Sequence, residues 1–388
     1  MLRRFALALF FCTVALLGQD TPPQEAAPDP KSLLDAGNLL YLKGDYAAAG
    51  QTYQQAWDAL QQTPPENPMR YDALKRMVSV RAAAGQFKEA NDFLQTAINW
   101  REQILGPADP IITDDLLQSV GLFRGMKDYG QALVVLNRVL SMHVRAGSFE
   151  SILVADDYSR MAQIYLEQQK AEDAISPLNT SIAIRTRLGG PLDPGMVYDL
   201  DRLGAVQTTL RAYDQAENAY RHALVIRESL FGKIHADLIA DVDGLAYALF
   251  GEKKFDDAEP VYLRLLGLWA ASVGEDHPMV AVALDKVAVF YIEQKKFDKA
   301  KEMADQANAI RAKFLAEGLS EQATEQFAEG NKEETVALYK RAVQALEPPN
   351  PLYDKLHKEL SDMLDAVNLL TPKSLTKKAP ATTAKKKQ

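Results

Sequence analysis

An aromatic residue, two polar residues and an alanine recur along the middle of this chain at a constant interval of 42 residues. The clearest copies are Tyr213-Asp-Gln-Ala216, Phe255-Asp-Asp-Ala258 and Phe297-Asp-Lys-Ala300. A fixed period of this length is typical of a solenoid, in which each repeat is one supersecondary unit that buries its apolar face only against its neighbours. The chain is therefore expected to form one long array of similar units.

The same pattern extends on both sides of these copies. Turns between two helices are expected at Gly44-Asp-Tyr46, Gly85-Gln-Phe87, Lys127-Asp-Tyr129, Lys170-Ala171, Ala212-Tyr213, Lys254-Phe255, Lys296-Phe297 and Gly330-Asn-Lys332. The alanine recurs as Ala49, Ala90, Ala132, Ala174, Ala216, Ala258 and Ala300. We expect it where the second helix of a unit crosses the first too closely for a larger side chain. Apolar residues in both helices follow helical spacing, which predicts that both are amphipathic.

Two further features repeat with the turns. A tyrosine stands seven residues after the turn aromatic or its equivalent, as Tyr53, Tyr220, Tyr262 and Tyr339, and is expected to pack between successive units. The units are joined by Gly-Pro-Ala-Asp-Pro110, Gly-Pro-Leu-Asp-Pro194 and Gly-Glu-Asp-His-Pro278. In such a linker the glycine ends one helix, Asp or His caps the next, and proline suits its first turn.

Large-small pairs in the first helices complete the pattern, at Leu203-Gly204, Leu245-Ala246 and Val287-Ala288. Together with the aromatic turn, the alanine and the tyrosine they resemble tetratricopeptide repeats. The 42-residue period, the His-Pro linker and endings such as Ile226-Arg-Glu-Ser-Leu resemble the longer kinesin-light-chain subclass. The resemblance covers residues 31–345, about eight repeats. It implies an all-α, right-handed superhelix of helical hairpins, an α-solenoid, whose first helices line a concave groove.

Segments outside the repeats have different compositions. Residues 1–18 hold two arginines and then an apolar run shorter than a membrane-spanning helix, which predicts a secretory signal peptide. An uncleaved N-terminal anchor is the alternative, and lipidation at Cys12, the only cysteine, is a weaker one. Residues 19–30 are predicted to be a Pro-rich linker and 351–370 a C-terminal capping helix. The tail, residues 371–388, is too polar to order itself. The protein is accordingly expected in the periplasm or outside the cell, with no transmembrane segment once the leader is removed.

Charge is distributed unevenly along the chain. The net charge is −8, but residues 1–18 carry two arginines and the tail six lysines, with no acid in either segment, so residues 19–370 carry −16. Such a body repels nucleic acid and anionic lipid. The tail is either a solvated end or a tether to an anionic polymer, an envelope surface or nucleic acid, or to the protein's own acidic groove.

No catalytic signature is present, and we predict no catalytic residue, no cofactor and no metal site. Motifs for nucleotide binding, zinc proteolysis and serine hydrolysis are missing. The five histidines are dispersed, and His235 and His277 are 42 residues apart in linkers, which favours a capping role. Arg185, Arg227 and Arg311 share one register near the ends of second helices, where a cation suits the helix dipole and nearby carboxylates.

Three aspartates form the main candidate site. Asp201, Asp243 and Asp285 repeat every 42 residues in the first helices. Kinesin-light-chain-like repeats often carry at this position an asparagine that hydrogen-bonds the backbone of an extended peptide. The other candidate residues of this face are Tyr247, Phe250, Ile292, Asp156, Ser159 and Gln163.

Two functional interpretations follow from this face. The first is a non-catalytic scaffold that binds an extended, basic segment of a protein or peptide partner. The alternative is a solvated acidic face on a structural protein that self-associates or organises an envelope complex.

Overall fold

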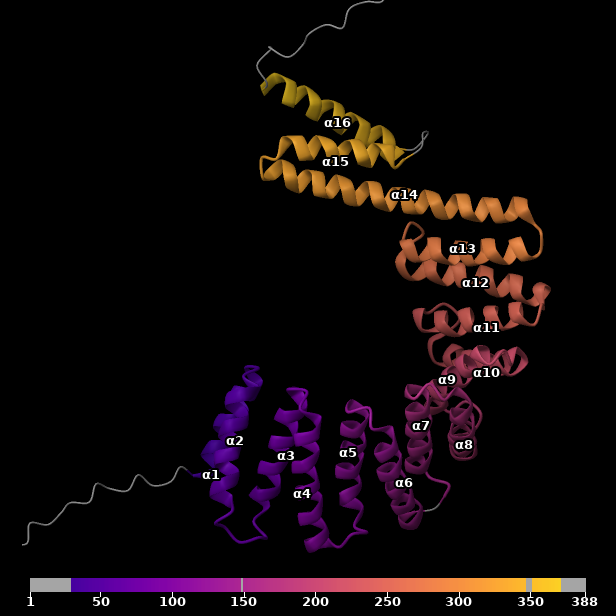
Figure 1. Ribbon diagram of the computed structural model, residues 1–388. Coiled ribbons are helices and arrows are strands. Elements are labelled where there is room, and N and C mark those ends of the chain that lie inside the picture. The colour runs from indigo at the N-terminus through magenta and orange to yellow at the C-terminus, as the bar shows by residue number, and fades with distance from the viewer. Residues whose placement is uncertain (1–28, 148, 347–350, 371–388) are drawn as a thin grey trace, which may run out of the picture. The chain divides into compact units, whose positions relative to one another are not determined.

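The structure, a computed structural model, describes residues 29–147, 149–346 and 351–370. All the regular secondary structure in these ranges is helical, which confirms the all-α prediction (Figure 1). The predicted leader and basic tail lie outside the described residues, as does the predicted linker up to residue 28. Among the described helices, none is both long enough and apolar enough to cross a lipid bilayer.

Contacts divide the chain into two compact units, residues 1–142 and 143–388, and each is considered by itself. The boundary falls inside α6. The helices of the first unit are α1 (Pro30–Leu42), α2 (Tyr46–Leu60), α3 (Pro68–Ala83), α4 (Phe87–Leu105), α5 (Thr113–Gly125) and α6 (Tyr129–Ala146), with the 3-10 turn η1 (Pro110–Ile112) before α5.

The second unit continues the same order of helices. They are α7 (Ile152–Glu167), α8 (Ala171–Gly189), α9 (Val197–Thr209), α10 (Tyr213–Phe231), α11 (Ile239–Gly251), α12 (Phe255–Val273), α13 (Pro278–Glu293), α14 (Phe297–Ala328), α15 (Lys332–Gln344) and α16 (Pro351–Leu370), with the 3-10 turns η2 (Pro194–Met196) and η3 (Ala236–Leu238) before α9 and α11. Odd- and even-numbered helices pair into hairpins from α1 to α14, and within each unit the hairpins stack in chain order (Figure 1).

The predicted turns are confirmed, because the second helix of each hairpin begins at the expected turn residue. Two residues before each of these helices the backbone adopts the left-handed conformation. Glycine occupies this position in three turns, as Gly44, Gly85 and Gly330. In the other five it is a residue with a side chain, such as Lys295 with φ of 59°. These turns are strained, since a Cβ in this region costs about 1–2 kcal/mol.

The alanines and tyrosines have the packing roles predicted for them. Every alanine of the motif is at most 5% exposed, and the four tyrosines at most 8%. Tyr220 shows how one of these tyrosines joins two units. A Cβ added at Gly204 of α9 would lie 2.7 Å from its Cζ, and one added at Gly244 of α11 would lie 2.4 Å from it. The ring is therefore wedged between the first helices of consecutive hairpins, which fixes the spacing of α9 and α11.

The linkers also have the predicted stop and start signals. Gly106, Gly190, Gly232 and Gly274 follow the last residue of a second helix and have φ between 80° and 92°. The side chains of Asp109, Asp193, His235 and His277 then accept a hydrogen bond from the backbone N–H two residues further on. The prediction that His235 and His277 are linker caps is confirmed.

Helix α14 departs from the repeating pattern. It is continuous over 32 residues and serves both as the second helix of the seventh hairpin and as the first helix of the eighth. Its first half packs on α13, where Ala307 joins Val280 and Leu284. Its second half packs on α15, where Leu319 and Ala323 join the apolar cluster that also holds Leu356 of α16. The predicted capping helix is confirmed as α16.

Candidate functional site

The three predicted aspartates lie at equivalent positions of α9, α11 and α13, and each is paired with a cation of the protein. Arg227 Nη2 lies 2.6 Å from Asp201 Oδ2, and Lys286 Nζ lies 2.6 Å from Asp243 Oδ1. Arg311 donates to Asp285. The carboxylates therefore do not present a row of unneutralised acceptors. A basic ligand has to compete with these intrachain cations.

A second set of aspartates, at the repeat position two residues before that of the candidate aspartates, was not identified from the sequence. Asp115, Asp157, Asp199 and Asp241 recur every 42 residues and are at most 1% exposed. We call them the buried aspartates. Their regular spacing is a signal that is visible in the sequence. They differ from the candidate aspartates in burial, because a neighbouring hairpin covers them. Like the candidate aspartates, each of them has a polar partner within the chain.

One partner of each buried aspartate comes from the preceding second helix. Arg101 donates to Asp115, with Nη1 to Oδ2 of 3.0 Å. His143 Nδ1 lies 2.6 Å from Asp157 Oδ2. Ser181 donates to Asp199 at 2.6 Å, because Arg185 turns to Asp156 instead. These contacts join successive hairpins and satisfy carboxylates that water does not reach.

Arg227 links both sets of aspartates. It bridges Asp201 and Asp241, with one guanidinium between two carboxylates. Burial raises the pKa of Asp241 to about 7, and the nearby Asp201 carboxylate adds to the rise, against the opposing effect of Arg227. The group holds more negative than positive charge when both carboxylates are ionised.

Four of the predicted residues line a pocket of about 550 Å³ between the first helices α11 and α13. We call it the α11–α13 pocket. The lining comprises Thr208, Asp243, Gly244, Tyr247, Phe250, Tyr262, Val282, Asp285, Lys286 and Val289. Apolar side chains in it are open to solvent, since Tyr247 is 50%, Val282 41% and Val289 57% exposed. The pocket is large enough for one or two side chains of a ligand.

Two polar features lie beside the apolar lining of the α11–α13 pocket. The hydroxyl of Thr208 is buried and interacts with the hydroxyl of Tyr220, but no hydrogen bond of normal geometry with a residue that the structure describes satisfies it. The Asp243–Lys286 ion pair lies in the lining and is partly exposed, at 38% and 42% of the side chains. An apolar wall, one unsatisfied hydroxyl and one exposed ion pair together suit an apolar ligand group that also offers a hydrogen bond.

The hairpins that form this pocket also match a known family. The sequence model of the tetratricopeptide repeat matches residues 154–229 and 238–313. These segments are tetratricopeptide repeats. They cover α7 to α10 and α11 to the first half of α14, so the α11–α13 pocket lies almost wholly within the second matched segment. Repeats of this family typically serve as scaffolds for protein–protein interaction rather than as catalysts.

Three solved structures are similar to this chain. A tetratricopeptide repeat sensor protein of the signal transduction ATPase class from Pyrococcus horikoshii is similar with a TM-score of 0.50 and 12% identity, over 72% of this chain and 42% of that one. BtubC (BKLC) from P. vanneervenii has a TM-score of 0.47 and 20% sequence identity, over 58% of this chain and 91% of that one. A structure of putative kinesin light chain repeats from Podospora anserina has a TM-score of 0.46 and 16% sequence identity, over 53% of this chain and 98% of that one. A search of curated proteins gives no match.

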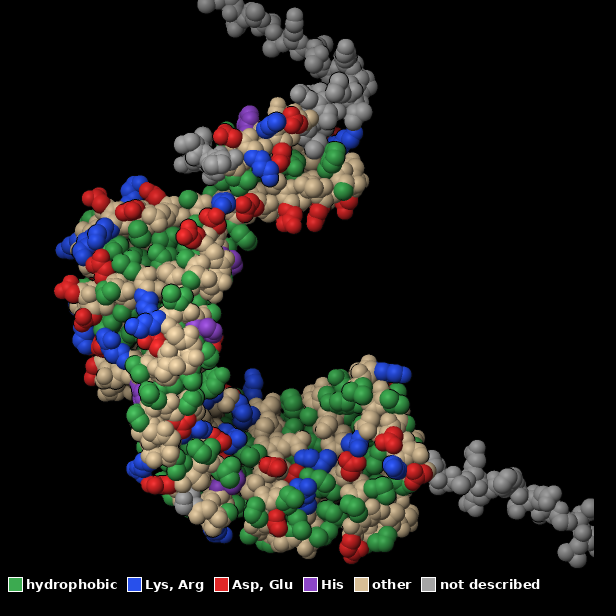
Figure 2. Space-filling view, turned by 180° about the vertical axis from the view of Figure 1, so that it is seen from behind, with side chains coloured by type: hydrophobic (Ala, Val, Ile, Leu, Met, Phe, Trp, Pro, Cys, Tyr) green, Lys and Arg blue, Asp and Glu red, His purple; other side chains and the backbone are tan. Residues whose placement is uncertain are grey.

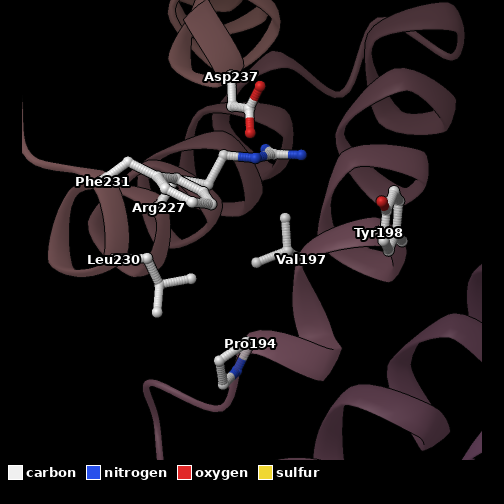
Figure 3. A pocket seen from close by; sticks show the side chains of 7 residues that line it. All are labelled: Pro194, Val197, Tyr198, Arg227, Leu230, Phe231 and Asp237. Carbon is white, nitrogen blue, oxygen red and sulfur yellow. The ribbon is translucent and has the colours of Figure 1, made fainter. Parts of the chain in front are cut away.

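A smaller pocket of about 350 Å³ lies at the linker end of the tetratricopeptide repeats (Figure 3). Tyr198, Leu230 and Phe231 are exposed around it, and Arg227 and Asp237 supply its polar edge. The Arg227 guanidinium is already held by Asp201 and Asp241, so it is not free to pair with a ligand. This pocket is therefore a weaker candidate than the α11–α13 pocket.

The remaining predicted residues of the tetratricopeptide face lie elsewhere. On α7, Asp156 accepts from Arg185, Ser159 donates to Asp199, and Gln163 donates to Glu167 at 3.2 Å. Ile292 is 52% exposed near the end of α13 and does not line the pocket. Sequence reasoning missed Val282, Val289, Lys286 and Thr208. The two valines could have been found, because they lie on the same helical face as Asp285.

The acidic side chains and histidines are not arranged for metal binding in the part of the chain that the structure describes. Within those ranges, no three side chains of His, Cys, Asp or Glu are grouped so that they could hold an ion. The interior acids instead pair with Arg, His, Lys, Ser or Tyr side chains, as Asp115 does with Tyr71 at 2.7 Å.

Proposed function

We propose that this protein is a non-catalytic interaction scaffold that binds an extended segment of a partner protein in the α11–α13 pocket. The observation that carries the proposal is the exposed apolar lining shared by two successive first helices. Tyr247 comes from α11, and Val282 and Val289 come from α13. Apolar side chains that are exposed, gathered and concave are the usual mark of a binding site.

The lining indicates which ligand fits. A large apolar side chain of the ligand fills the pocket against Tyr247 and Val289, and a backbone or side-chain group of the ligand satisfies Thr208. A flanking basic residue of the ligand exchanges with Lys286 on Asp243. The net charge of −16 over residues 19–370 attracts a basic segment at long range and speeds its encounter.

Rigidity of the scaffold supports this mode of binding. The walls of the pocket are helices that share one apolar cluster, in which Tyr262 of α12 packs on Phe290 of α13 with ring centroids 5.1 Å apart. A preformed pocket loses little conformational entropy when a ligand binds, so a short segment suffices for specific recognition.

A selection from a library of random peptides displayed on phage tests the proposal and reveals which side chains the pocket prefers. Selection against the wild-type protein is expected to enrich peptides that share one large apolar residue. Val289→Asp should reduce their binding by about tenfold or more, since it places a charge in the apolar wall. The matched control is Leu263→Asp, at a residue of α12 that is 45% exposed and outside the pocket. Equal binding to wild type and V289D would refute the proposal.

We further propose that the scaffold acts after export. The support is residues 1–18, which have the charge and apolar pattern of a secretory signal. N-terminal sequencing of the protein from fractionated cells tests this. A mature N-terminus near residue 19 in the exported fraction is expected, whereas an intact N-terminus in the cytoplasmic fraction would contradict it.

A further inference from the structure

The second half of α14 presents a face that no described helix covers. In the first half, the buried Ala300 and Ala307 and the partly buried Met303 point to α13. The buried residues of the second half, such as Ala316 and Leu319, point to α15. Nine residues separate Ala307 from Ala316, which turns the helix by about 180°. The side of the second half that continues the α13 face is therefore left open.

This open face has its own side chains. Phe314 is 56% exposed, and Glu317, Glu321 and Glu325 follow it at helical spacing on the same side. None of the three glutamate side chains has an ion pair or hydrogen bond with a residue that the structure describes, whereas the candidate aspartates are all paired. We call these four residues the α14 open face. Acidic side chains line one edge of the part of the molecule that holds α14 to α16 (Figure 2).

We propose that the α14 open face binds the protein's own basic C-terminal segment, residues 371–388. The segment holds six lysines and no acidic residue, so its charge is opposite to that of the three glutamates. Lysine side chains also suit Phe314, because their methylene stems cover apolar surface and their ammonium groups are attracted to the face of an aromatic ring.

The place where the segment begins makes this docking possible. It follows α16 directly, and α16 packs on α15, which packs on the second half of α14. Leu356 of α16 belongs to the same apolar cluster as Leu319 of α14. From Leu356 to the end of α16 is about 20 Å at 1.5 Å per residue. A chain of 18 residues spans at most about 60 Å, so its distal lysines are able to extend back past Leu356 toward α14.

Covalent connection favours this occupant over a free ligand. A segment tethered by a short flexible chain is present near its site at an effective concentration in the millimolar range. Weak pairs between exposed charges, worth little when two molecules must meet, are then sufficient to hold the segment in place. The arrangement does not involve the α11–α13 pocket, so it stands or fails independently of the proposed function.

Photochemical cross-linking of the full chain tests the proposal. Benzoylphenylalanine replaces Ala379, within the basic segment, and the products of irradiation are mapped by mass spectrometry. Cross-links to residues 311–328 are expected at low salt, and their yield should fall at 1 M NaCl, where the Debye length is about 3 Å. Mixing isotopically light and heavy chains distinguishes docking within one chain from docking between two copies.

A charge variant and a matched control complete the test. Glu317→Gln, Glu321→Gln and Glu325→Gln together should lower the yield about tenfold, as expected for the loss of three exposed ion pairs. The same number of charges is removed from the first turns of second helices in Asp256→Asn, Asp257→Asn and Asp298→Asn, which should leave the yield unchanged. Cross-links that map elsewhere, that join only light to heavy chains, or that persist in the triple glutamine variant would each overturn the proposal.

Discussion

A single methyl group at Gly244 should disturb the stacking of two hairpins. Gly244 lies inside α11, where alanine by itself favours the helix by about 1 kcal/mol. The added Cβ would, however, lie 2.4 Å from Cζ of Tyr220, where carbon atoms normally approach to about 3.5–4.0 Å. The gain in helix propensity is therefore set against a severe overlap.

The overlap cannot be relieved by a small movement of the ring. On its other side Tyr220 contacts Gly204, where a Cβ would lie 2.7 Å from the same Cζ, and the residue is only 8% exposed. Relief requires α9 and α11 to separate, which opens the apolar cluster around Tyr220 and Leu245. Overpacking of this kind costs about 1–3 kcal/mol, so Gly244→Ala is expected to destabilise by an amount in that range.

Denaturant unfolding followed by circular dichroism measures this effect. The control is Gly267→Ala in α12, where nothing lies within 4 Å of the added Cβ and a gain of up to about 1 kcal/mol is expected. In a Tyr220→Ala background, Gly244→Ala should lose its cost, because the overlapping ring is gone. If Gly244→Ala is as stable as Gly267→Ala with Tyr220 in place, the wedge explanation is wrong.

Three further predictions concern charge and backbone strain. Burial raises the pKa of Asp241 in the folded protein from 3.8 to about 7, so the free energy of unfolding should fall as pH rises from about 4 to 7. Asp241→Asn should remove this part of the pH dependence, which denaturation curves at several pH values measure. Arg227→Trp alone should cost about 3 kcal/mol in urea unfolding above pH 7, where Asp241 is ionised and is left without its cation. The double variant Arg227→Trp/Asp241→Ala, which copies Trp269 and Ala283 one repeat later, should recover most of that cost. Lys295→Gly should raise the unfolding free energy by about 1 kcal/mol, since φ is 59° there, and an unchanged denaturation midpoint would contradict the strain.

Packing positions were predictable from the sequence because their surroundings repeat with them. Ala258 is buried at a helix crossing, and the residue 42 positions before or after it meets the same crossing. The same type of side chain therefore fits at every such crossing, and it recurs in the sequence every 42 residues. The turns, the linker caps and the capping helix were predicted for the same reason, since each depends on local geometry that a few residues determine.

Charge partners were less predictable, because one position can be satisfied in several ways. Asp199 and Asp241 are equivalent in the repeat, yet one accepts from Ser181 and the other from Arg227. Likewise Asp243 pairs with Lys286 on the next first helix, whereas Asp285 pairs with Arg311 on a second helix. The period shows that an acid recurs but not which cation reaches it. That is why the sequence predicted a row of candidate aspartates on one face but not the cation that pairs with each of them.

The position of Trp269 shows which charges serve the fold. Arg101, His143 and Arg227 occupy one repeat position, and each of them contacts a buried aspartate. In the repeat that follows Arg227, the same position holds Trp269. The position of the buried aspartate then holds Ala283, which is 1% exposed. Both members of the pair have changed to apolar residues, and Trp269 packs beside Val280 and Leu284. A pair that apolar packing replaces in the next repeat serves to join hairpins. The proposed recognition of a partner is therefore assigned to side chains outside that register, and in the second unit the exposed apolar residues of the α11–α13 pocket meet this condition.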